Sequence, residues 1–178
     1  MAKKLNIKRK RNSVSDPGRP LKKNYRIPRF LSYLLNLTSV SIDKNIGDIS
    51  RDLRLEIAEQ YFYDNDIDPE KVLEELKTNK RAFDYTGAAV RRPEHANLTY
   101  VNTAIRLNER EFHLISRAAE HARAYPCNFY WDPMIKRCMG MLKRFGYSKN
   151  KLFEGFREWE DFLVKTRSNA ASSNKVYK

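Results

Sequence analysis

The stretch Lys22–Phe30, KKNYRIPRF, decides how the first half of the chain folds. Polar and apolar side chains alternate through it until a proline ends the alternation. A period of two predicts a short β-strand, with Tyr25 and Ile27 on one face and Asn24 and Arg26 on the other. A strand of this length buries too little surface to be stable alone, so it needs a partner strand.

A second stretch, Leu98–Leu107, gives the clearest strand signal in the chain, because LTYVNTAIRL alternates and is rich in Thr, Tyr, Val and Ile. One face would carry Val101, Thr103, Ile105 and Leu107, and the other Tyr100, Asn102, Ala104 and Arg106. Pairing the two strands would expose Asn24, Arg26, Asn102 and Arg106 together. The sequence leaves open whether the strands pair within one chain or between two chains.

Each predicted strand is followed by two amphipathic helices. Apolar residues at three- and four-residue spacing predict one helix directly after the first strand and another through Ile49–Tyr61. The stretch LTSVSI, residues 37–42, could also alternate as a strand. After the second strand, Asn108 and Glu111 have the spacing of a capping box. Asp132-Pro133 predicts the start of the next helix, after a longer turn.

These patterns divide the chain into six segments. They are a disordered basic tail (1–20), a strand-helix-helix unit with an extra helix (21–78), a linker (79–97), a second strand-helix-helix unit (98–146), a C-terminal amphipathic helix (147–167) and a disordered tail (168–178). The expected fold class is mostly α with a short antiparallel β-ribbon. The last helix has a wide apolar face, which the rest of the chain or a partner must cover.

The charge of the chain favours a polyanionic partner. It has 35 basic and 22 acidic residues, a net charge of +13, which suits nucleic acid or an anionic membrane surface. Nine basic residues lie within residues 1–23 against Asp16 alone, so much of this charge belongs to the tail. No apolar run is long enough to span a membrane, and no secretory signal is recognisable. We therefore expect a cytoplasmic protein whose thiols, Cys127 and Cys138, are free.

Catalytic patterns are missing from the sequence. His113 and His121 are eight residues apart with Cys127 nearby, which is not a zinc spacing. There is no Gly-rich phosphate loop and no nucleophile motif. We expect a protein that is not an enzyme and that holds no cofactor and no metal.

The two strand-helix-helix units resemble the ribbon-helix-helix DNA-binding proteins, a family that includes the Arc and MetJ repressors. The resemblance covers roughly residues 21–63 and 98–146. It implies that two units intertwine, that their strands form an antiparallel ribbon in the major groove, and that the start of the second helix contacts phosphate. Two units in one chain are similar to TraY-type proteins, which bind near the transfer origin of conjugative plasmids in the relaxosome.

The resemblance also implies which residues contact DNA. The expected base contacts are Lys22, Asn24, Arg26, Asn102, Ala104 and Arg106, with Ala104 standing where a polar side chain is usual. The expected phosphate contacts are Lys8, Arg9, Lys10, Arg11, Arg19, Lys23 and Arg29. Asn can bond adenine and Arg can bond guanine in a bidentate manner, while the tail would add affinity without sequence choice.

The sequence thus predicts a DNA-binding protein of plasmid or mobile-element biology. It would be a relaxosome accessory factor or a repressor of its own operon, with double-stranded DNA as partner, a relaxase or other transfer protein as candidate partner, and self-association open. The alternative is a small helical adaptor that binds a protein through its C-terminal helix. In that case the tail supplies nonspecific affinity for DNA or RNA.

Overall fold

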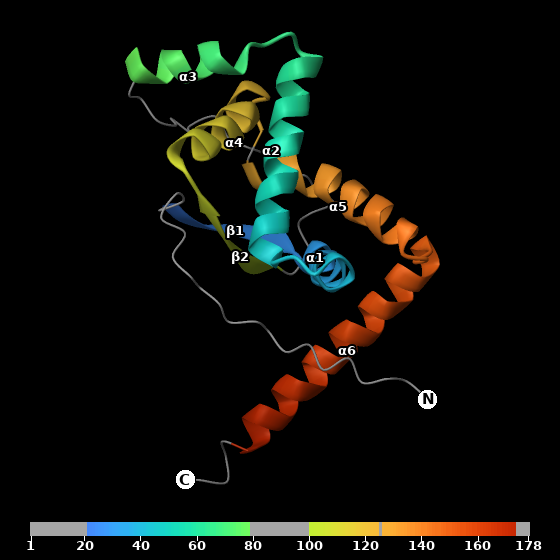
Figure 1. The fold of residues 1–178 in the computed structure, drawn as a ribbon. Helices are drawn as coiled ribbons and strands as arrows, with labels where there is room; N and C mark the ends of the chain where they lie inside the picture. Colours follow the sequence, from blue (N-terminus) through green and yellow to red (C-terminus); the bar gives the residue numbers. More distant parts are fainter. Residues whose placement is uncertain (1–20, 79–99, 125, 174–178) are drawn as a thin grey trace.

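The computed structural model describes residues 21–78, 100–124 and 126–173 (Figure 1). The predicted basic tail, the whole predicted linker and the last five residues lie outside this part of the chain. The elements are β1 (Leu21–Pro28), α1 (Arg29–Ile42), α2 (Ile46–Asp64), α3 (Pro69–Thr78), β2 (Tyr100–Leu107), α4 (Glu109–His121), α5 (Pro126–Arg144) and α6 (Lys149–Ser173). The predicted fold class, mostly α with a short antiparallel ribbon, is confirmed.

The two strands pair with each other within the single chain. β1 runs antiparallel to β2 over all eight residues of each strand, from Leu21 opposite Leu107 to Pro28 opposite Tyr100. The ribbon has one covered and one open face, because exposed and less exposed residues alternate along both strands. This answers the question that the sequence left open about pairing within or between chains.

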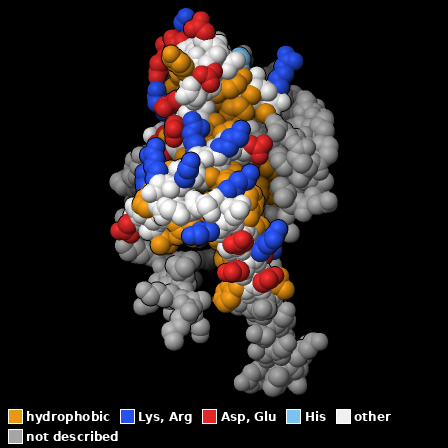
Figure 2. All heavy atoms as spheres, turned by 90° about the vertical axis from the view of Figure 1, so that its right-hand side faces the viewer, with side chains coloured by type: hydrophobic (Ala, Val, Ile, Leu, Met, Phe, Trp, Pro, Cys, Tyr) orange, Lys and Arg blue, Asp and Glu red, His pale blue; other side chains and the backbone are white. Residues whose placement is uncertain are grey.

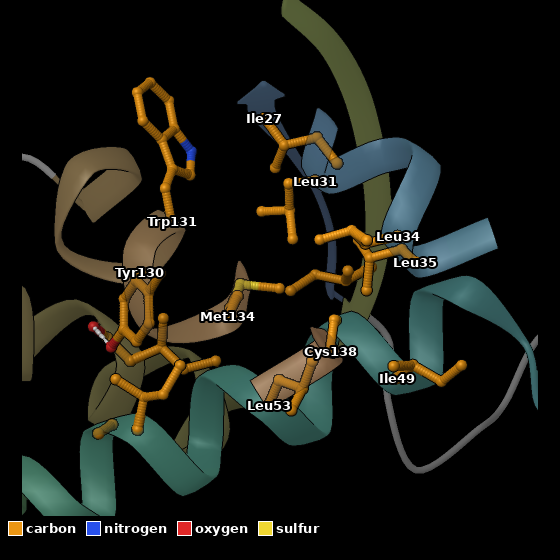
Figure 3. Packing of buried hydrophobic residues seen from close by; sticks show 14 of the residues in the cluster. Ile27, Leu31, Leu34, Leu35, Ile49, Leu53, Tyr130, Trp131, Met134 and Cys138 are labelled. Atoms are coloured by element: carbon orange, nitrogen blue, oxygen red, sulfur yellow. Dashed lines mark hydrogen bonds between the residues drawn. The ribbon is translucent and has the colours of Figure 1, made fainter. Parts of the chain in front are cut away.

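The two units share one core rather than having one each. α1 packs on α5 of the other unit as well as on α2, and α2 packs on α4 and α5. In Figure 3, Met134 and Cys138 of α5 lie against the leucines that α1 contributes, Leu31, Leu34 and Leu35. All five side chains are fully buried. Separating the units would expose this apolar surface, so they form one cooperative structure.

The backbone of the first unit recurs in the second at an interval of 80 residues. Asp43 and Arg123 both have a left-handed backbone, with φ of 49° and 51°. Asp66 and Gly146 are also both left-handed, with φ of 54° and 83°. α2 and α5 begin at residues 46 and 126, and α3 and α6 at 69 and 149. Backbone hydrogen bonds recur as well: Ile67 N donates to Phe62 O, and Tyr147 N to Leu142 O. The two units are therefore gapless structural repeats.

This repeat corrects the predicted second turn. The sequence analysis placed the start of the helix at Asp132-Pro133, but α5 begins at Pro126 and contains Pro133. The turn is consequently about as long as the first one, since both units turn at a left-handed residue, Asp43 or Arg123. A proline in a helix removes one backbone donor but does not prevent helix formation when tertiary packing compensates. Its neighbour Met134 supplies such packing, because it is fully buried.

Two helix ends also differ from expectation. α1 continues to Ile42, so residues 37–42 are helical; Thr38 is buried inside the core and its hydroxyl donates to Leu34 O at 2.8 Å. α6 continues to Ser173, so part of the segment expected as a tail, 168–178, belongs to the helix. No Gly or Pro interrupts the sequence there to end it earlier.

α6 is held to α1 by aromatic rings. Phe30 stacks on Phe153 with ring centroids 5.0 Å apart, and Tyr33 contacts both Phe156 and Trp159. Burial raises the pKa of the Tyr33 hydroxyl above its usual value. Much of the apolar face predicted for the last helix is thus covered by the chain itself.

Cys138, the cysteine whose side chain the structure describes, is free as the sequence predicted. Cys138 is fully buried, and burial raises its pKa to about 12, with a smaller opposing effect from its hydrogen bond with Thr38. The thiol form therefore persists at every pH at which the fold would be studied. The side chain of Cys127 lies outside the described residues.

Two helical glycines allow the packing of α6 to be tested. A Cβ at Gly140 of α5 would meet nothing within 4 Å, so Gly140→Ala should raise the free energy of unfolding by about 0.5–1 kcal/mol. A Cβ at Gly155 of α6 would collide with the Tyr33 hydroxyl. Gly155→Ala should therefore lower the free energy of unfolding by about 1 kcal/mol, despite the same gain in helix propensity. Urea denaturation measures both, and equal gains would show that α6 does not pack on Tyr33.

Candidate nucleic-acid interface

The open face of the ribbon brings together the six predicted base-contacting residues. They face one another in three cross-strand pairs: Lys22 opposite Arg106, Asn24 opposite Ala104, and Arg26 opposite Asn102. Five of the six are exposed and Arg106 is half-buried. The side chains come from both units and from positions about 80 residues apart in sequence, and only strand pairing makes them neighbours.

Arg26 is positioned by the second unit. Trp131 of α5, only 4% exposed, donates its indole Nε1–H to the Arg26 carbonyl oxygen at 3.1 Å. Its ring lies 5.2 Å from that of Tyr100, and the Arg26 guanidinium carbon lies 5.4 Å from the Tyr100 ring centre. Backbone and side chain of Arg26 are therefore both fixed by residues of the other unit. A guanidinium group whose N–H donors are already held in place loses less conformational entropy when it binds a partner.

The covered face of β1 rests on a buried charge. Arg54 of α2 is completely buried, with its guanidinium carbon 4.2 Å from the ring centre of Tyr25 and 5.1 Å from that of Tyr130. The Tyr130 hydroxyl donates to Ile115 O at 2.7 Å. Tyr25 lies between Asn24 and Arg26 in the strand, so this stack supports the middle of the open face from below. Cation–π contacts of desolvated groups are among the stronger ones.

The start of α2 reaches the middle of β2. A Cβ at Gly47 would lie 3.1 Å from the Ala104 carbonyl oxygen, so a residue without a side chain allows the close approach. The helix is capped by Asn45, whose Oδ1 accepts from Gly47 N at 2.7 Å, and not by Asp48. Asp48 instead pairs with Arg51 at 2.8 Å. The helix terminus thus lies beside the ribbon, where its aligned peptide dipoles favour an anion.

The ribbon has a symmetric backbone and asymmetric side chains. The 80-residue interval relates Lys22 to Asn102, Asn24 to Ala104 and Arg26 to Arg106. The central pair, Asn24 opposite Ala104, therefore joins equivalent positions. Only the arginines are the same in both units, and they lie toward opposite ends of the ribbon.

The two predicted phosphate contacts that the structure describes, Lys23 and Arg29, do not lie on the open face. Lys23 lies on the covered side with its Nζ 4.4 Å from the ring centre of Phe112. Arg29 pairs with Glu160 of α6 at 3.6 Å. The other predicted phosphate contacts belong to the tail, Lys8, Arg9, Lys10, Arg11 and Arg19, and lie outside the described residues.

The two histidines that the structure describes have roles within the fold. Tyr61 Oη lies 2.9 Å from His121 Nδ1, which joins α2 to α4, and His113 Nε2 lies 3.7 Å from the Glu109 carboxylate. Among the described residues no group of three or more His, Cys, Asp or Glu side chains could hold a metal ion.

Sequence reasoning missed Arg54 and Trp131 as supports of the ribbon. Arg54 lies on an otherwise apolar helical face, one residue after Leu53, and an Arg there looks like a surface residue. Trp131 was assigned to the turn before a helix, so its contact with β1 was not visible.

Comparisons of the chain with protein-family models, with curated proteins and with solved structures give no match. In the described part of the chain, no helix has the length and apolar character needed to cross a membrane.

The hydrogen bond to Arg26 can be tested with the two tryptophans. Trp131→Phe removes the donor to the Arg26 carbonyl and should lower the free energy of unfolding by about 1 kcal/mol more than Trp159→Phe. Trp159 is a matched control, because its ring packs on Tyr33 without a comparable hydrogen bond to β1. Urea denaturation gives the stabilities, and hydrogen exchange of the β1 amides should accelerate in Trp131→Phe alone. Equal effects of the two substitutions would contradict this role.

Proposed function

We propose that this chain binds double-stranded DNA sequence-specifically, with the open face of the β1–β2 ribbon in the major groove. The observation that carries the proposal is the cross-strand arrangement of Arg26, Asn102, Asn24, Lys22 and Arg106 on one face. These are the side-chain types that bond base edges, and intrachain pairing presents them without a second copy. The resemblance to ribbon-helix-helix proteins supports the same interpretation.

The dimensions of the ribbon suit the major groove. That groove is about 12 Å wide and admits a two-stranded ribbon, whereas the minor groove of undistorted B-DNA is only about 6 Å wide. The two arginines at opposite ends would each contact a guanine through O6 and N7. The start of α2, beside Ala104, would approach the phosphate backbone as the ribbon enters the groove.

The asymmetry of the side chains bears on the DNA site. Arg26 and Arg106 occupy equivalent positions, while Lys22 and Asn102, or Asn24 and Ala104, differ. The preferred DNA site would carry guanines at two symmetric outer positions, and the base pairs that lie between these guanines would not be symmetric. Such a protein fits a relaxosome accessory factor at a transfer origin, or a cytoplasmic repressor of its own operon.

The adaptor alternative receives less support from the packing of α6. Phe153, Phe156 and Trp159 contact Phe30 and Tyr33 of α1, so the first half of the helix completes the fold. Among the side chains of α6 described up to residue 164, the most exposed apolar ones are Phe162 at 63% and Val164 at 58%. A partner bound by this part of α6 would use the side chains beyond the α1 contact.

The ribbon proposal can be tested on duplexes selected from a random pool. Arg26→Lys retains the charge but loses the bidentate fork, and Asn102→Ala removes an amide. Each should reduce the ratio of affinities for selected and random duplexes by about 1–3 kcal/mol, or about 5- to 150-fold. The salt dependence should stay nearly unchanged for Arg26→Lys. Arg137→Lys makes the same exchange at a residue that pairs with Glu56 of α2 instead of facing outward from the ribbon, so it is the matched control and should bind like the parent chain.

Deleting residues 1–20 separates the tail from the ribbon. The deletion should weaken binding to selected and random duplexes alike and reduce the salt slope, because the tail contributes phosphate neutralisation. Failure to enrich any duplex from the pool would contradict sequence-specific binding. So would loss of all binding on tail deletion, combined with unchanged ratios for the two ribbon variants.

A further inference from the structure

The corners where each unit's second helix meets its third carry opposite charge. The first, residues 56–74 at the α2–α3 junction, has seven acidic residues against Lys71 alone and is called the acidic corner. The second, residues 136–154 at the α5–α6 junction, has six basic residues against Glu154 alone and is called the basic corner. The 80-residue interval makes the two segments structurally equivalent. Net charges of −6 and +5 therefore occupy matching places on one fold.

Figure 2 shows this separation on one face of the molecule. Acidic side chains gather at its upper end, where Figure 1 places the α2–α3 junction, and basic side chains spread over the middle, at the height of α5. Charge is already balanced where α2 and α5 cross, because Arg137 pairs with Glu56 at 3.1 Å. Beyond that crossing, the side chains of Glu59, Asp66, Lys143, Arg144 and Lys151 have no ion-pair partner within the residues that the structure describes.

Each corner also exposes a large aromatic residue amid its charges, apart from Phe153, which is 40% exposed but stacks on Phe30. Tyr63 in the acidic corner is 82% exposed, and Phe145 in the basic corner is 52% exposed. Tyr63, Asp64, Asp66 and Asp68 border an open hollow of about 930 Å³. This is within the range of sites that enclose small molecules, about 300–1,000 Å³, so an aromatic ring with flanking basic groups can enter it. Aromatic anchors ringed by polar residues are typical of energetically important contacts.

Both corners lie far from the ribbon. α2 starts beside Ala104 and has 19 residues, so its end is about 28 Å away. α5 has the same length and contacts β1 through Trp131 in its first third. A duplex in contact with the ribbon would therefore not neutralise the basic corner, and a surface of opposite charge is present on the chain itself.

We propose that the basic corner of one chain docks into the acidic corner of a second copy, with Phe145 entering the hollow beside Tyr63. Because the two surfaces differ, the contact is heterologous: a docked pair still has one open acidic corner and one open basic corner, so chains extend head to tail. Exposed ion pairs are individually weak, so association depends on several pairs plus the aromatic anchor and weakens with salt. Each added chain presents one further ribbon, which does not itself take part in the contact.

Sedimentation velocity of the full chain without DNA tests the proposal independently of the ribbon. The parent chain should form a concentration-dependent series of species at low salt and be monomeric at about 0.5 M salt. A basic-corner variant, Lys143→Gln with Arg144→Gln, should be monomeric at low salt. An acidic-corner variant, Glu59→Gln with Asp64→Asn, should also be monomeric. These four positions avoid the left-handed Asp66 and the Asp68 that caps α3, so folding should be unaffected, which circular dichroism checks.

Mixing the two variants decides the geometry. Each retains one intact corner, so an equimolar mixture should form one-to-one dimers and nothing larger. Phe145→Ala should weaken association of the parent chain at least tenfold without changing its net charge. A monomeric parent chain at low salt, a mixture that stays monomeric, or a variant that still dimerises alone would overturn the proposal. If the monomeric basic-corner variant bound the duplex more weakly than the parent chain, the proposal would also be overturned, because the basic corner would then contact nucleic acid.

Discussion

The pairing of β1 with β2 is the constraint on which the rest of the structure depends. Neither strand is long enough to stand alone, and neither unit has its own core. Once Leu21 faces Leu107 and Pro28 faces Tyr100, the helix that follows each strand must leave from opposite ends of the ribbon. α1 is thereby carried against α5 and α2 against α4, so the units intertwine.

The same pairing gives each strand a support from the other unit. Trp131 of the second unit bonds the Arg26 carbonyl, and Phe112 of the second unit lies under Lys23. The open face is therefore held rigid by contacts between the two units, which neither unit could make alone. A ribbon of six surface side chains on such a base can present donors and acceptors in fixed relative positions, which is what base recognition requires.

Much of the fold could be predicted because it depends on local periodicity. Alternation in KKNYRIP and LTYVNTAIRL identified both strands and their faces, and the Asn108–Glu111 spacing identified the capping box of α4, which the structure contains. The start of α5 could not be found this way, because Asp132-Pro133 has the local chemistry of a helix start while tertiary packing continues the helix through it. Arg54 was equally hidden, because its burial depends on Tyr25 and Tyr130, which are distant in sequence.

The sequence showed two strand-helix-helix units, but their exact 80-residue interval escaped analysis because many equivalent positions keep the backbone and change the chemistry. Arg54 corresponds to Met134 and Arg51 to Trp131, and all four are buried, so these two core positions are filled by a charged group in one unit and an apolar group in the other. Glu56 and Asp64 likewise correspond to Lys136 and Arg144 on the surface. In two separate identical chains, every substitution would appear twice and the surfaces would stay alike. Joining the units in one chain frees them to differ, and an asymmetric ribbon and oppositely charged corners both follow from that freedom.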